Sequence, residues 1–312
     1  MRHGSLSRNR EQPIAETVER AQYVSAILKQ SLDGRRPLMS TQPVRVVRHS
    51  DGVVELLLDD PGRGNALDLP TAEALRDAAA DITADPGGAV LLRAAGGNFC
   101  VGGDLRAFAG RGADTASYVH AVASAAHEAV RALHELPVPV VAAVRGAAAG
   151  GGIGLALAGD LVVAARSARF RLAYTAIGLT PDCGASWILQ RLLGPRRAAD
   201  LILTNRVLTG EDAERWGLVS RLVEDDDLDD TAYRTAAELA AGSGAALRAA
   251  KELLRAGAEA PLEKQLAEEA RSIAALAGGA EAQVAMDSFL AARSRGRAPS
   301  ARSAQEKPQS VS

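Results

Sequence analysis

Two glycine-rich turns carry the residue types and spacing in this sequence that could do chemistry. Residues 150–152 are three consecutive glycines between an apolar segment and an apolar helix, and residues 96–103 hold four glycines after a second apolar segment. Glycine leaves backbone N–H groups uncovered, and N–H groups at a helix N-terminus stabilise anions. Brought to one point, the two turns would hold the oxyanion of an enolate or of a tetrahedral intermediate.

Phosphate binding and plain packing are two further interpretations of these turns. Neither turn has the spacing of a GxxxxGK[ST] or GxGxxG motif, so phosphate binding is the weaker one. Close packing between a helix and a strand explains each turn equally well when that turn is taken alone.

Asp182 is a carboxylate whose role the residues alone leave open, because it stands directly before a predicted helix. One carboxylate can take a proton from one carbon and return it to another, which suffices for a 1,3-proton shift. Capping of the helix that begins near Gly184 is the alternative role. The neighbouring Cys183 is expected to be a packed core thiol, because the sequence assigns it no base.

The elements that must position these residues alternate between strands and helices. Apolar patterning predicts strands at 44–49, 53–58, 89–94, 138–144 and 161–165, and helices at 69–84, 114–136 and 151–158. This alternation predicts a mostly parallel sheet with helices on its faces, whose first two strands form a hairpin. Further helices are predicted near 185–193, 196–203, 210–216, 230–241, 244–256, 261–277 and 280–292.

Composition and charge narrow the classes of protein. The 312 residues have a formal net charge of −2, which gives no electrostatic case for nucleic acid. The longest apolar run is too short to span a membrane. Only two cysteines occur, which argues against a disulfide scaffold and fits a cytoplasmic location. Residues 1–38 are expected to be a loosely ordered extension and residues 294–312 a disordered tail.

Several motifs carry a family resemblance. Residues 99–105, 150–152 and 159–161 resemble the two signatures of the crotonase (enoyl-CoA hydratase/isomerase) superfamily, and residues 61–67 and 213–219 resemble its early turn and late helix. The resemblance covers residues 44–293. It implies an α/β fold built as a crotonase-type spiral of ββα units, with a core at 39–203 and a helical trimerisation region at 204–293.

The resemblance also implies the substrate and its contacts. The substrate would be an acyl-CoA thioester, as in fatty acid metabolism, and the protein a homotrimer or hexamer; coenzyme A would be part of the substrate, with no separate cofactor and no metal. The amides of Cys100 and Gly151 would form the oxyanion hole. The expected CoA contacts are Arg63 and the backbone of Ala66, Leu67, Gly103, Asp104 and Leu105. Arg63 could equally be a solvated turn residue, and Asp104 is better explained as a helix N-cap.

The chain departs from the hydratases of this family at both of their glutamates. One position, two residues after the glycine triplet, is Gly154, and the other is Tyr174. Neither side chain replaces a glutamate as a general acid or base near neutral pH. Asp182 resembles instead the catalytic aspartate of the ring-opening isomerases of the phenylacetate pathway. The sequence therefore predicts an enoyl-CoA isomerase that uses a single aspartate.

Three alternatives to the isomerase stay open. Asp182 together with His127, on the predicted long helix, resembles the pair in the 4-chlorobenzoyl-CoA dehalogenases, where the aspartate is the nucleophile and the histidine the base. A lone helix histidine is, however, more often a surface or core residue. An atypical enoyl-CoA hydratase, and a family member that binds CoA without catalysis, also stay open.

Overall fold

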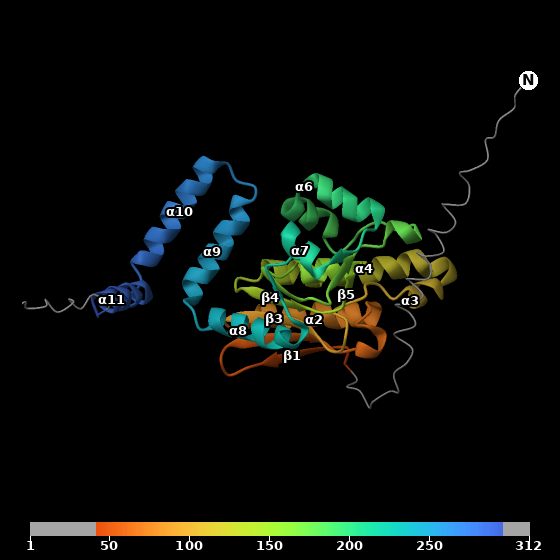
Figure 1. Cartoon of the computed structure of the whole chain (residues 1–312), viewed down its shortest axis with the longest axis horizontal. Helices are drawn as coiled ribbons and strands as arrows, with labels where there is room; N and C mark the ends of the chain where they lie inside the picture. Colours follow the sequence, from red (N-terminus) through yellow and green to blue (C-terminus); the bar gives the residue numbers. More distant parts are fainter. Residues whose placement is uncertain (1–41, 296–312) are drawn as a thin grey trace, which may run out of the picture. The chain divides into compact units, whose positions relative to one another are not determined.

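The computed structural model describes residues 42–295 of the chain. It divides into two compact units between Gly244 and Ala245 (Figure 1). The expected N-terminal extension and most of the expected tail lie outside the described residues. Of the helices predicted from residue 204 onward, those that end by residue 240 belong to the first unit and the later ones to the second.

A six-stranded sheet forms the centre of the first unit. Its strands are β1 (Val44–Arg48), β2 (Val53–Leu58), β3 (Ala89–Ala94), β4 (Val140–Val144), β6 (Leu161–Ala165) and β9 (Arg221–Val223). Their order is β1-β2-β3-β4-β6-β9. β1 and β2 pair antiparallel and every other pair is parallel, which confirms the predicted hairpin and parallel sheet.

Helices cover both faces of this sheet because successive side chains of a strand point to opposite faces. In β4, Val140 and Ala142 join the core cluster that also contains residues of α2 (Leu69–Ala84) and α4 (Thr115–Glu135). Val141 and Ala143 join a second cluster with residues of α8 (Leu228–Ala240). Strands buried on both faces read as continuous apolar runs, which is why they could be predicted from the sequence.

A small second sheet lies next to the glycine-rich turns. It contains β5 (Ala147–Ala149), β7 (Arg169–Arg171) and β8 (Leu208–Thr209), in the order β5-β7-β8. These strands were not predicted from the sequence, because two or three residues are too few to show an alternating pattern. Their effect on the site is large, since β5 joins the two turns.

Three of the four remaining helices of the first unit lie near predicted positions, whereas the one at 105–109 was not predicted as a separate element. The four helices are α3 (Leu105–Ala109), α5 (Gly151–Ala156), α6 (Ala185–Thr204) and α7 (Gly210–Trp216), with short 3₁₀ segments at Pro61–Arg63, Gly112–Asp114, Thr175–Ile177 and Asp225–Asp227. α6 is kinked at Gly194, whose φ is +76°, directly before Pro195. The kink explains why the sequence predicted two helices there.

The second unit consists of three helices, α9 (Gly244–Gly257), α10 (Leu262–Ala277) and α11 (Ala280–Arg295). Several of its large apolar side chains are exposed, among them Leu254 (79%), Leu262 (73%) and Ile273 (70%). Within residues 42–295, no helix is long and apolar enough to cross a membrane.

Candidate active site

Backbone pairing between Cys100 and β5 joins the two glycine-rich turns. The Cys100 N–H donates to the Ala147 carbonyl at 3.0 Å, and the Ala149 N–H donates to the Cys100 carbonyl at 2.8 Å. Gly102 has a φ of +87°, and a Cβ atom there would lie 2.7 Å from the Ala149 carbonyl oxygen. Glycine is required at this position, and the turn at 96–103 consequently lies against the start of α5.

The expected role of the Cys100 amide as an oxyanion-hole donor is wrong, because that N–H is already bonded to Ala147. The Gly103 N–H fits the role instead, together with the Gly151 N–H that the resemblance implies. Within the described part of the chain, the N–H groups of Gly103 and Gly151 have no hydrogen-bond acceptor, and both residues line a cavity. Gly151 is the first residue of α5, where an N–H has no partner inside the helix. Gly103 and Gly151 thus form the candidate oxyanion hole.

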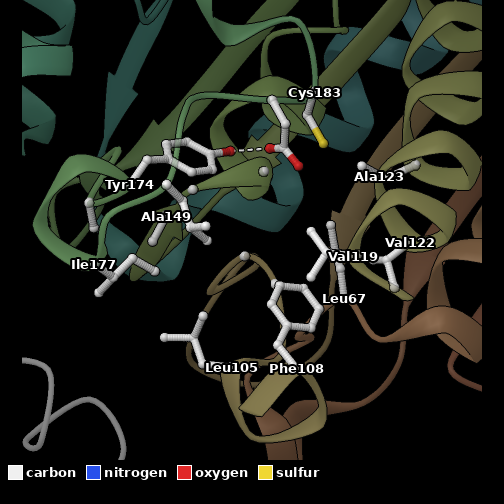
Figure 2. A pocket seen from close by; sticks show the side chains of 18 of the residues that line it. Leu67, Leu105, Phe108, Val119, Val122, Ala123, Ala149, Tyr174, Ile177 and Cys183 are labelled. Atoms are coloured by element: carbon white, nitrogen blue, oxygen red, sulfur yellow. Dashed lines mark hydrogen bonds between the residues drawn. The ribbon is translucent and has the colours of Figure 1, made fainter. Parts of the chain in front are cut away.

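The cavity beside these two amides has a volume of about 270 Å³. Leu105 and Phe108 of α3, with Val119, Val122 and Ala123 of α4, form an apolar wall (Figure 2). The polar side chains of the lining are Tyr174, Thr180, Asp182 and Cys183. Among the lining residues that the structure describes, Asp182 is the only acid, so the cavity suits an apolar group next to a single carboxylate.

Tyr174 and Asp182 form a hydrogen-bonded pair in this cavity. The Tyr174 hydroxyl donates to Asp182 Oδ1 (Figure 2). Burial raises the pKa of Tyr174, and the negative charge of Asp182 raises it further, so the phenol keeps its proton and acts as a donor. A Cβ atom at Gly151 would lie 3.5 Å from Asp182 Oδ1, which places the carboxylate beside the candidate oxyanion hole. The alternative role of Asp182 as a helix cap is not observed, because no side chain caps α6.

His127 holds the backbone next to Asp182. Its Nε2 atom, on α4, accepts the Cys183 N–H at 3.0 Å. Cys183 has a φ of +48°, a left-handed conformation that costs energy in a residue with a side chain. The structure therefore brings His127, Asp182 and Cys183 together, as the sequence suggested for the first two. The Nε2 lone pair is occupied, however, by the backbone of the loop.

Both thiols are packed in the core, as expected for Cys183. Their exposed fractions are 0% for Cys100 and 1% for Cys183. Burial raises the pKa of Cys100 from 9.0 to about 12. Burial, followed by the charge of Asp182, raises the pKa of Cys183 well above its usual value. Neither thiol is an activated nucleophile near neutral pH.

The residues expected to contact CoA divide into two groups. Leu67, Gly103 and Leu105 line the cavity. Ala66 is buried. The Asp104 carboxylate accepts the N–H groups of Arg106 and Ala107 at 3.0 and 3.2 Å, so it caps α3, which is the alternative role that the sequence favours.

Arg63 lies outside the lining residues and is held by three carboxylates. Its guanidinium pairs with Asp60 at 2.6 Å, Asp68 at 2.6 Å and Asp104 at 3.2 Å. Partial burial by itself lowers the pKa of Arg63, but the hydrogen bonds to Asp68 and Asp60 outweigh it and raise the pKa. The observed role of Arg63 is to tie the early turn to the start of α3.

Comparison with known proteins identifies the family. The model of the family described as enoyl-CoA hydratase/isomerase matches residues 48–295. The chain belongs to this family. A solved structure of an enoyl-CoA hydratase from Bacillus anthracis superposes with a TM-score of 0.75 at 30% identity, and the match covers 83% of this chain and 98% of that one. The α/β crotonase fold expected from the sequence is therefore confirmed.

Relatives in the enoyl-CoA hydratase/isomerase family carry different activities in their names. A Rhodobacter capsulatus protein named "Probable enoyl-CoA hydratase" is 39% identical over 245 residues, which is 78% of this chain and 93% of the relative. The 1,2-epoxyphenylacetyl-CoA isomerase of Escherichia coli K12 is 37% identical over 252 residues, which is 78% of this chain and 94% of the relative. Membership of the family consequently establishes an acyl-CoA enzyme, and the geometry of the site has to select the reaction.

Gly154 stands where the resemblance implies a hydratase glutamate, and the structure leaves no space there for a side chain. A Cβ atom at Gly154 would lie 2.0 Å from the Cys183 carbonyl oxygen and 2.6 Å from Cys183 Cβ. The loop that carries Asp182 fills this space. The acidic side chain that lines the cavity thus comes from this loop and not from α5.

We predict that Gly154→Ala displaces this loop and lowers the free energy of unfolding by about 1–3 kcal/mol. Turnover of the acyl-CoA substrate should fall about 100-fold, because Asp182 moves with the loop. Gly97→Ala is the matched control, because a Cβ atom at Gly97 meets nothing within 4 Å. Urea unfolding and steady-state kinetics measure both effects. Equal stability and turnover in the two variants would contradict the packing of the loop on Gly154.

We predict that the two thiols of the native chain react slowly with Ellman's reagent between pH 7 and 9. A raised pKa means that the thiolate of Cys100 forms only as the pH approaches about 12, whereas in the unfolded chain it forms near pH 9. Absorbance of the released thionitrobenzoate measures the reaction. Two thiols per chain should react promptly in denaturant, and fast reaction of the native chain at pH 8 would contradict the burial.

Proposed function

We propose that this protein is an enoyl-CoA isomerase that moves a double bond through one carboxylate, that of Asp182. The observation that carries the proposal is that Asp182 is the only acidic side chain lining the cavity in the described part of the chain, beside two free amides. Hydration requires a placed acid and a placed base. A single carboxylate suffices to move a proton between two carbons of the same substrate.

The amides of Gly103 and Gly151 would bind the thioester carbonyl oxygen. They are held in place by the pairing of Cys100 with β5 and by the start of α5, so little reorganisation is needed when negative charge develops. Removal of one such donor typically costs about 3 kcal/mol of transition-state stabilisation. This stabilisation acidifies the C–H bonds at the α-carbon of a 3-enoyl thioester and at the γ-carbon of a 2-enoyl thioester, because loss of either proton gives the same dienolate.

Asp182 would then carry the proton. Its carboxylate takes a proton from the γ-carbon of a 2-enoyl thioester or, in the opposite direction, from the α-carbon of a 3-enoyl thioester, and the C–H electron pair enters a dienolate. For the 3-enoyl substrate, the same carboxylic acid returns the proton to the γ-carbon, which leaves the 2-enoyl thioester and the starting carboxylate. Tyr174 donates to Oδ1, so Oδ2 is left to carry the proton. The raised pKa of Tyr174 keeps the phenol from competing as a base.

The competing activities receive less support from the same geometry. A dehalogenase or hydrolase would use His127 as a base, but its Nε2 atom accepts the Cys183 N–H. An atypical hydratase would need a second proton-transfer group, and Tyr174 is held as a donor to Asp182. For CoA itself, Leu67, Gly103 and Leu105 remain the proposed contacts because they line the cavity.

We predict that Asp182→Asn abolishes conversion of 3-enoyl-CoA to 2-enoyl-CoA but leaves acyl-CoA affinity nearly unchanged. The amide cannot accept the proton, whereas it preserves the volume of the carboxylate. Absorbance of the conjugated thioester and calorimetry measure turnover and binding. Tyr174→Phe should lower turnover about tenfold, as expected for loss of one hydrogen bond to a charged group. Asp77→Asn, at an exposed position of α2, is the neutral control.

Three outcomes would contradict the proposal. Full activity of Asp182→Asn would exclude the carboxylate as the proton carrier. Accumulation of 3-hydroxyacyl-CoA as the first product would identify a hydratase. Binding without turnover of any 3-enoyl-CoA, from short to long chains and with ring-bearing acyl groups, would identify a family member that only binds CoA.

We also propose that the protein is a homotrimer or hexamer. The second unit exposes Leu254, Leu262 and Ile273, and exposed apolar side chains on successive helices are typical of surfaces that bind another subunit. Light scattering should give about three or six times the 32.3 kDa of one chain. Leu254→Glu should lower that mass, whereas Glu259→Gln should not, and a monomeric wild-type chain would contradict the proposal.

A further inference from the structure

His127, Asp182 and Cys183 form a cluster whose chemistry the isomerase reaction does not use fully. One ring nitrogen, one carboxylate oxygen and the Sγ atom lie within 4.8 Å of one another. No other group of three such side chains is found among residues 42–295. The cluster joins α4 to the loop before α6, and two of its members line the cavity.

We infer that this cluster binds a zinc ion. The ion is coordinated by the carboxylate of Asp182 and excludes the acyl substrate from the cavity. The donors are imidazole nitrogen, carboxylate oxygen and thiolate sulfur, a set that suits Zn²⁺ and does not suit Mg²⁺ or Ca²⁺. Three protein ligands leave one tetrahedral position for water. The inhibitory consequence rests on the proposed role of Asp182, whereas binding of the ion does not.

The separations of the ligand atoms are close to those that zinc can bridge. Zinc bonds are about 2.3 Å long to sulfur and about 2.0–2.1 Å to nitrogen or oxygen. A shift of about 1 Å in the donors therefore closes a tetrahedral set from a cluster that spans 4.8 Å. His127 is the exposed member and supplies this movement, at the cost of the hydrogen bond that Nε2 accepts from the Cys183 N–H.

The surroundings of the cluster support such a site. Tyr174 donates to Asp182 Oδ1, which fixes the carboxylate and leaves Oδ2 for the ion, as partners of ligating carboxylates do. The exposed side of His127 gives the ion a path from solvent, while Cys183 is buried at the inner end. Binding replaces the S–H bond by a Zn–S bond and releases one proton to the buffer, with no change of oxidation state.

Titration of the full-length chain with Co²⁺ and Zn²⁺ tests the inference. We expect one ion per chain, a thiolate-to-cobalt charge-transfer band, and displacement of cobalt by zinc. Cys183→Ala should remove the band and lower zinc affinity about 100-fold, because loss of a ligand costs at least as much as loss of a partner that orients a ligand. Cys100→Ala, which removes the other thiol of the chain, should keep the charge-transfer band and the zinc affinity.

Additional variants keep the test decisive if Cys183→Ala folds poorly. Thermal melting selects folded variants, and Cys183→Ser and His127→Gln should each weaken zinc binding, whereas His120→Gln, on the same helix, should not. Inhibition by zinc is measured relative to the zinc-free rate of each variant. A cobalt band that survives in Cys183→Ala or disappears in Cys100→Ala would overturn the inference, as would absence of binding at micromolar zinc. Because these readouts need no turnover, failure of the isomerase proposal would be seen separately.

Discussion

The pairing of Cys100 with β5 is the interaction on which the rest of the site depends. Two hydrogen bonds, to Ala147 and from Ala149, join the turn after β3 to the turn before α5. A strand alternates the direction of its N–H groups, so an amide used for this pairing cannot also face a ligand. Gly102 and Gly103 therefore carry the chain away from β5, and the Gly103 amide is left at the cavity. Without this pairing, the amides of Gly103 and Gly151 would belong to two independent loops.

The loop that carries Asp182 is fixed from two sides. Gly154 lets the Cys183 backbone approach α5 to a distance that any side chain would prevent, and His127 binds the Cys183 N–H from α4. The left-handed conformation of Cys183 is maintained by these contacts. One consequence is chemical: the carboxylate enters the cavity from a loop next to Tyr174. Gly154, which stands where the resemblance implies a hydratase glutamate, is thus part of the packing that positions Asp182.

Secondary structure could be predicted from the sequence where the pattern was long enough. The strands buried on both faces, such as β3 and β4, and the amphipathic helices α2 and α4 lie close to their expected bounds. The short strands β5, β7 and β8 could not be predicted, because two or three residues are too few to show an alternating pattern. The resemblance implies the Cys100 amide as a donor, and only the structure shows that this N–H is bonded to Ala147, because β5 could not be predicted.

The sequence by itself determined the family, the two glycine-rich turns, and the glycine and tyrosine at the two positions where the resemblance implies hydratase glutamates, because these are properties of residue type and order. Tertiary structure alone decided which amides stay free and what Asp182 binds. It also decided that Arg63 is occupied by three carboxylates, and that His127, Asp182 and Cys183 meet. The physical reason is that a backbone amide or a carboxylate is defined chemically by its partner, and here the partners come from other segments of the chain.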